Sequence, residues 1–136
     1  MTLELEKKDV DISGWVNFEG YFDILIRYTS MSDLQLILNK CKSTSYIKHQ
    51  PKEDIDTDKL YRELAKCILD WKGLTASLVA SKLVPIKVPE GQENTEIPCT
   101  DKNKLLLLKE AYGFAAFIQQ ASTDLSALKQ EIERKN

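Results

Sequence analysis

The clearest pattern of apolar and polar positions lies on the two sides of Gly20. Both flanking runs, 12–18 and 21–29, are rich in aromatic and β-branched residues, and in the second run every other residue is apolar: Phe22, Ile24, Ile26 and Tyr28. A period of two is typical of a strand with one buried face, and glycine tolerates the positive φ of a tight turn. The sequence therefore predicts a β-hairpin. Because a lone hairpin is only marginally stable in water, helices or a second chain must cover its apolar face.

Two segments have the i, i+3, i+4, i+7 spacing of an amphipathic helix with a recognisable N-cap. The first follows Ser30, which forms a capping-box variant with Asp33, and extends to about residue 43. The other begins at Thr100 or Asp101 and carries apolar residues as far as Ile132. Gly113 within it predicts a break or a close helix contact.

A further helix is predicted from Asp56 or Thr57 up to the stretch Asp-Trp-Lys-Gly-Leu at 70–74. Its apolar stripe continues to Trp71, so periodicity places Trp71 in the core. Gly73 is suited to the left-handed position after the last helical turn, and Leu74 to the apolar residue that folds back on it. We therefore interpret Trp71, Gly73 and Leu74 as a structural helix stop. Asp70 is left without an explanation, because an acid is unfavourable at a helix C-terminus.

The remaining segments lack a clear period. Residues 1–11 are charged and predict a flexible N-terminal arm, and residues 43–56 predict a loop. In 75–100 we expect a short helix, a Pro-rich loop and a short edge strand at 86–88. The charged residues 129–136 are expected to fray. The prediction for the whole chain is an α+β fold, mostly α-helical, with the N-terminal β-hairpin packed on about four helices in a single domain over 12–136.

Composition narrows the classes of function. The 136 residues have a formal net charge of −2, which gives no electrostatic reason to expect nucleic acid. One locally basic stretch with a single aromatic residue is better explained as a solvated loop; it contains Lys40, Lys42, Tyr46, Lys48 and Lys52. The apolar runs are too short to span a bilayer and no secretory signal is visible, so we expect a cytoplasmic protein without a membrane role.

The cysteines and the histidine do not predict a metal site. Cys41, Cys67 and Cys99 are widely separated, their number is odd, and His49 is the only histidine. A structural zinc site usually needs four Cys or His ligands in close pairs. Cys41 and Cys67 fall at apolar helical positions and are interpreted as small core residues. We expect no metal ion and no cofactor.

No sequence motif of a known catalytic class is present. His49 lies in a polar segment and is interpreted as solvated. Asp70 is the one acid beside an aromatic residue, and a small hydrolase or transferase built around it is the alternative from another class of function. We expect no catalytic residue and a protein that acts by binding.

Apolar residues of the C-terminal helix exceed a single stripe, since Leu106 and Leu107 lie beside Leu105 and Leu108. Apolar surface that a monomer leaves uncovered usually marks a protein interface. We therefore expect partner contacts at Leu106, Leu107, Phe114 and Phe117, and at the outer face of the hairpin. Mutual coverage of the helices is the alternative.

Three stretches together resemble a known family. They are "WVNFEGYFDILIRYTSMSDLQLIL" from Trp15, "DTDKLYRELAKCILDWKGLT" ending at Thr75, and "IPCTDKNKLLLLKEAYGFAAFIQQAS" from Ile97. The order of these stretches is similar to that in the small tail assembly chaperones of long-tailed bacteriophages and prophages. The shared features are the Trp-x-Gly stretch, the Pro-containing stretch before a capped helix, and the two phenylalanines near the end of that helix, here Phe114 and Phe117. Residues 75–96 are longer than the compact turn expected there.

The resemblance implies a non-enzymatic role. Such proteins bind the long helical tape measure protein, keep it soluble, help recruit tail tube subunits, tend to form homo-oligomers and are absent from the mature virion. It implies no catalytic residue. The alternative within the same setting is another structural accessory of a phage or prophage, such as a tail completion or connector factor.

Overall fold

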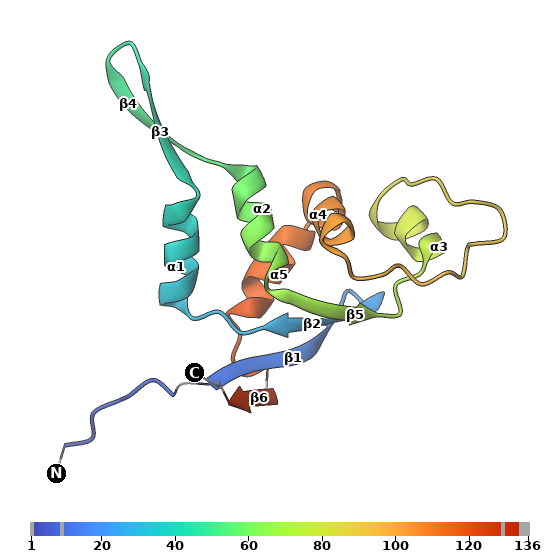
Figure 1. Ribbon diagram of the computed structural model, residues 1–136, viewed down its shortest axis with the longest axis horizontal. Coiled ribbons are helices and arrows are strands. Elements are labelled where there is room, and N and C mark those ends of the chain that lie inside the picture. The colour runs from blue at the N-terminus through green and yellow to red at the C-terminus, as the bar shows by residue number, and fades with distance from the viewer. Residues whose placement is uncertain (1, 9, 129, 134–136) are drawn as a thin grey trace.

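The computed structural model describes residues 2–8, 10–128 and 130–133 and has a mixed α+β architecture (Figure 1). The strands are β1 (Val10–Phe18), β2 (Phe22–Arg27), β3 (Lys42–Ile47), β4 (Gln50–Ile55), β5 (Ile68–Lys72) and β6 (Gln130–Glu133). The helices are α1 (Met31–Lys40), α2 (Thr57–Ala65), α3 (Ala76–Leu78), a π-helical turn η1 (Val79–Leu83), α4 (Asp101–Glu110) and α5 (Phe114–Ser122). The prediction of a mostly α-helical fold is therefore wrong, because the strands are a comparable part of the structure.

The predicted N-terminal hairpin is confirmed, and it forms the centre of a larger sheet. β1 and β2 pair antiparallel, with Phe18 opposite Phe22 and Trp15 opposite Leu25. β5 joins β2 and β6 joins β1, so that the strand order is β5-β2-β1-β6. The alternating residues Phe22, Ile24 and Ile26 are buried, as their period of two predicts.

Helices α2, α4 and α5 cover the buried face of this sheet (Figure 1). Phe114 of α5 is fully buried between the two hairpin strands' aromatic residues, with ring centroids 5.3 Å from Phe18 and 6.3 Å from Phe22. Phe22 also meets Trp71 of β5 edge-on, at 6.3 Å. Such aromatic contacts bury a large apolar area with defined geometry, so the core lies between this one face of the sheet and the helices.

The largest correction concerns residues 66–74. α2 ends at Ala65, and the residues predicted to complete it form strand β5. A β-bulge explains the error. Asp70 pairs with Leu25 and Ile68 with Ile26, so Leu69 is an extra residue in the β5 strand. The buried residues Ile68 and Trp71 are consequently three positions apart, which imitates the spacing of a helix.

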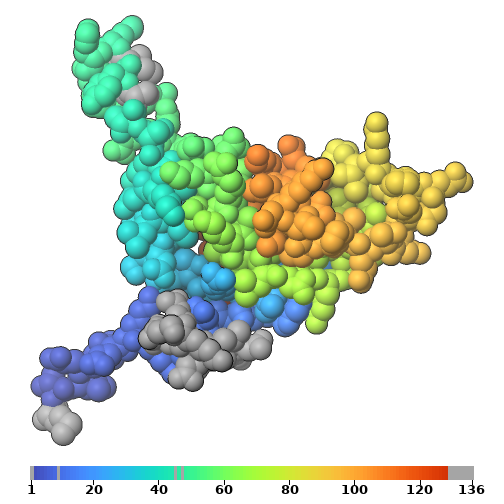
Figure 2. Space-filling view, in the orientation of Figure 1, coloured from blue at the N-terminus to red at the C-terminus, as the bar shows by residue number. Residues whose placement is uncertain are grey.

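A second hairpin, β3–β4, occupies the segment that was predicted to be a loop. Its strands pair only with each other among the described residues, and it projects away from the body of the molecule (Figures 1 and 2). Lys48 and His49 form its turn with φ of 52° and 64°, which are the signs required by a type I′ turn. The sequence signal was weak because neither turn residue is glycine or asparagine.

The helix boundaries follow the predicted caps. The side chains of Ser30, Asp56 and Thr100 accept hydrogen bonds from the backbone N–H groups of Asp33, Lys59 and Asn103. Gly113, with φ of 74°, separates α4 from α5, so the predicted break is confirmed and a helix continuous to Ile132 is not present.

Two further segments differ from the prediction. Residues 130–133 pair with β1 as strand β6, instead of ending a helix; residues 129 and 134–136, also predicted to fray, lie outside the described residues. Residues 86–88 form no strand, and the extended segment instead makes an isolated bridge between Thr75 and Glu96. No helix in the described part of the chain is long and apolar enough to cross a membrane.

Candidate functional site

One face of the four-stranded sheet carries no helix among the described residues. We call it the outer sheet face and define it by these residues: Trp15, Asp23, Leu25, Leu69, Asp70 and Lys72. The register places Trp15, Leu25 and Asp70 in one row across β1, β2 and β5, and places Asp23 beside Lys72 in the next row. Trp15 is 40% exposed, which is unusual for so large an apolar side chain.

Polar contacts hold the side chains of the outer sheet face in place. The Lys72 ammonium lies 4.4 Å from the centroid of the Trp15 ring, a cation–π contact between β5 and β1. The Asn17 side-chain amide donates a hydrogen bond of 3.0 Å to the Asp23 carboxylate. The face therefore has an apolar centre formed by Trp15, Leu25 and Leu69, with charges of both signs around it. This arrangement suits the binding of another protein segment.

The structure separates the four residues predicted to contact a partner. Leu107 and Phe114 are buried in the core, with 3% and 0% exposure, and Phe117 is half-buried against it. Only Leu106 is exposed. The four side chains therefore share no surface in this conformation, because α4 and α5 fold on the sheet and cover one another. The burial of Leu107 and Phe114 fits the alternative interpretation, in which the helices cover one another's apolar residues.

The stretch that was interpreted as a helix stop instead ends strand β5. Trp71 is buried, as predicted, and its indole Nε1 donates a hydrogen bond of 2.7 Å to the carbonyl oxygen of Ile97. Gly73 has the expected positive φ of 81°. Leu74 is buried, and its carbonyl accepts from the N–H of Ile97 at 2.8 Å. Trp71 and Leu74 thus fasten the long segment before α4 to the edge of the sheet.

Asp70, the candidate catalytic acid, lies on the exposed side of β5. Its carboxylate accepts a hydrogen bond of 2.8 Å from the backbone N–H of Trp71. General acid–base catalysis is favoured by an enclosed and apolar setting that shifts the proton affinity of the acid. Asp70 instead makes a structural hydrogen bond and lies on the outer sheet face.

The cysteines are dispersed through the fold. Cys41 and Cys67 are buried, which confirms their interpretation as core residues, and Cys99 is half-buried. Burial raises the pKa of the Cys99 thiol to about 11, and nearby Lys104 only partly opposes this. Burial likewise raises the pKa of the Cys67 thiol. No cluster of three or more metal-ligating side chains occurs within the described ranges. His49 lies exposed in the β3–β4 turn.

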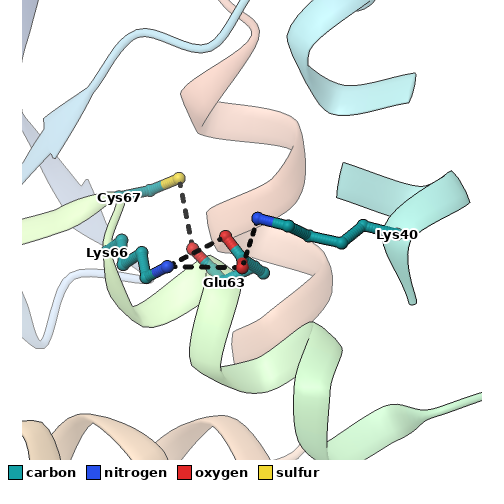
Figure 3. Close-up of polar contacts among 4 residues, drawn as sticks. All are labelled: Lys40, Glu63, Lys66 and Cys67. Carbon is teal, nitrogen blue, oxygen red and sulfur yellow. Dashed lines mark hydrogen bonds and ion pairs between the residues drawn. The ribbon is translucent and has the colours of Figure 1, made fainter. Parts of the chain in front are cut away.

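A charged cluster ties α1 to α2 (Figure 3). The Glu63 carboxylate accepts hydrogen bonds from Lys40 at 3.2 Å and from Lys66 at 3.3 Å, and the Cys67 thiol donates to the Glu63 carbonyl at 3.9 Å. Burial alone raises the pKa of Glu63, but the hydrogen bonds and charges of Lys40 and Lys66 outweigh it and lower the pKa. The cluster is explained by its structural role between two helices.

Part of the outer sheet face is predicted by the sequence. Contacts are expected on the outer face of the β1–β2 hairpin, because the alternation that buries Ile24 turns its neighbours to the other face. The contribution of β5 is not predicted, because the sequence pattern places Leu69, Asp70 and Lys72 at a helix end. The signal available was the run Cys-Ile-Leu-Asp-Trp, which is short and apolar and fits a strand as well as a helix.

Comparison of the chain with protein-family models, with curated proteins and with solved structures gave no match.

Proposed function

We propose that this protein is a tail assembly chaperone of a long-tailed bacteriophage or prophage, acting in the host cytoplasm by binding and not by catalysis. It binds apolar helical segments of the tape measure protein, keeps that protein soluble and helps to recruit tail tube subunits. The support is the resemblance of residues 14 to about 125 to that family, together with a surface in the fold that suits such binding.

The single observation that carries the proposal is the uncovered outer sheet face. A sheet whose opposite face is covered by α2, α4 and α5 has room for one further layer on this side. An amphipathic helix that docks there buries its apolar stripe against Trp15, Leu25 and Leu69. Its flanking charges meet Asp70 and Lys72, which both lie on the edge strand β5.

The energetics of such a contact centre on Trp15. Tryptophan is enriched at the residues that carry most of the energy of protein interfaces. Its position in the middle strand pair, with Lys72 against the ring, holds the ring in one place before binding, which reduces the entropy lost on association. The proposal thus moves the expected contact from the C-terminal helices to the sheet.

The experiment is co-expression with the long helical protein encoded by the adjacent gene, for three forms of the chain. The wild type is expected to keep this partner soluble and to co-elute with it. Trp15→Ser removes the centre of the outer sheet face and is expected to weaken the complex by about tenfold or more.

Tyr112→Ser is the matched control, because Tyr112 is a fully exposed aromatic residue between α4 and α5, away from the outer sheet face. It is expected to behave as the wild type. Binding that Trp15→Ser leaves unchanged contradicts the assignment of the surface. A wild type that neither binds nor solubilises the partner contradicts the proposed function.

A further inference from the structure

The β3–β4 hairpin projects from the body and has two free strand edges among the described residues (Figure 1). All side chains of β4 are exposed, and Tyr46 of β3 is 74% exposed. A free edge presents unpaired N–H and C=O groups that invite pairing with another strand. An edge this prominent needs either protection or a partner.

The backbone register determines which residues face each free edge. The N–H of Asp56 donates to the carbonyl of Cys41 at 2.7 Å, so this pair is hydrogen-bonded. Bonded and non-bonded pairs alternate along an antiparallel ladder. The pairs Lys42–Ile55, Thr44–Glu53 and Tyr46–Pro51 are therefore the non-bonded ones. Their N–H and C=O groups point outward, away from the partner strand.

Pro51 protects one of the two edges. It has no N–H group, and its register position places the missing donor on the outer edge of β4. The ladder inside the hairpin loses nothing by this, whereas a strand approaching β4 loses a hydrogen bond and meets the proline ring. The outer edge of β3 has no such residue: Lys42, Thr44 and Tyr46 all keep their outward N–H groups. On β4 only Glu53 and Ile55 keep an outward N–H, so β3 is the edge with the complete row of donors and the one favoured for pairing.

We propose that β3 pairs antiparallel with β3 of a second copy of this chain, about a two-fold axis at Thr44. In this register Thr44 lies opposite Thr44 of the other copy, and Lys42 opposite Tyr46 in both directions. All three outward-facing residues of each strand are then hydrogen-bonded, and the two hairpins become one four-stranded sheet. Pairing of this isologous kind is the simplest closed symmetry for a homodimer.

The side chains of β3 favour a second copy as the occupant. No acidic residue lies on β3, and the proposed register opposes no two lysines directly. Each Lys42 ammonium instead meets an exposed Tyr46 ring, a favourable cation–π pair, and Thr44 meets a threonine, a favourable cross-strand pair. The strand is therefore complementary to itself. This interface is separate from the outer sheet face and does not depend on the proposed function.

The experiment measures mass against concentration by sedimentation velocity for the wild type, Thr44→Pro and Glu53→Pro. Thr44 and Glu53 form a non-bonded pair, so their backbone N–H groups point to the outer edges of β3 and β4. Each proline therefore removes one outward N–H group and leaves the hydrogen bonds between β3 and β4 intact. The wild type and Glu53→Pro are expected to form dimers alike. Thr44→Pro is expected to stay monomeric at about tenfold higher concentration.

A Thr44→Cys variant tests the register independently of folding defects. Opposed residues in a bonded antiparallel pair lie about 5.5 Å apart at Cα, within the range of a disulfide. Rapid oxidation of Thr44→Cys to a covalent dimer, with little crosslinking of Glu53→Cys or of the wild-type cysteines, supports the proposal.

Three outcomes overturn the proposal. They are a wild type that remains monomeric at all concentrations, equal dimerisation of the two proline variants, and loss of the dimer on deletion of residues 2–8. The last outcome identifies the N-terminal arm, in which Leu3 and Leu5 are exposed, as the contacting segment instead of β3.

Discussion

Gly14 is a residue at which the fold leaves no room for a side chain. It lies in β1, and a Cβ atom built on it would approach the Leu128 Cα at 2.8 Å and the Ala127 carbonyl oxygen at 3.2 Å. Leu128 is fully buried and belongs to the core. Glycine at this position therefore allows the turn after α5 to pack directly on the sheet.

Gly14→Ala is accordingly expected to lower the free energy of unfolding by about 2–3 kcal/mol, because backbone atoms must shift to admit the methyl group. Chemical denaturation measures the effect. Gly91→Ala is the control, since Gly91 has a φ of +83° but no neighbour within 4 Å; its cost is about 1 kcal/mol from backbone strain alone. Equal effects at the two positions would show that the close approach to Leu128 is unimportant.

Among the elements, α1 and α2 are joined by the Glu63 carboxylate, whose side chain is 13% exposed while its lysine partners remain largely in solvent. Two cations from two helices at one carboxylate make this more than an ordinary surface ion pair. The ion pair with Lys40 spans the two helices, so the charge of Glu63 contributes to their packing.

Glu63→Gln is expected to lower the free energy of unfolding at pH 7 by about 1 kcal/mol. The pKa of Glu63 in the folded protein lies below its ordinary value of 4.5. Its stabilising effect is therefore fully present above that value and is lost as the pH falls through the folded pKa. Urea denaturation at a series of pH values is expected to show the difference between wild type and Glu63→Gln shrinking in acid. An exposed acid in the projecting hairpin, changed as Glu53→Gln, is expected to have little effect at any pH.

At the scale of the whole molecule, the chain consists of a sheet-and-helix body and a hairpin that projects from it (Figure 2). The body holds the apolar core, and the described core residues come from outside β3 and β4. The two ends of the hairpin lie side by side, because Lys42 pairs with Ile55. The hairpin can thus be removed without separating any core contact.

Replacement of residues 44–53 by Asn-Gly keeps the hydrogen-bonded pair Ser43–Asp54 to close the new two-residue turn. It is therefore expected to leave the body folded, with a free energy of unfolding within about 1 kcal/mol of the full chain. Thermal and chemical unfolding followed by tryptophan fluorescence report on the body through Trp71. A non-cooperative transition, or a loss of several kcal/mol, would mean that the hairpin supports the core after all.

Local sequence patterns determined those features that depend on neighbouring residues. The alternation at 22–28, the N-caps Ser30, Asp56 and Thr100, the positive φ of Gly20 and Gly73, and the break at Gly113 were all predicted, because each follows from the preferences of a few adjacent residues. The burial of Cys41, Cys67 and Trp71 was predicted too, because apolar residues at regular spacing are buried in either kind of element.

Only the tertiary structure decided which elements those residues form and which of them reach the surface. A strand at 68–72 exists because β2 offers an edge to it, and the bulge at Leu69 hides its period. Leu107 and Phe114 are buried because α4 and α5 meet the sheet, while Trp15 is exposed because no described helix covers its face. Pairing and coverage depend on residues far away in the chain, and the local pattern of apolar and polar positions does not contain them.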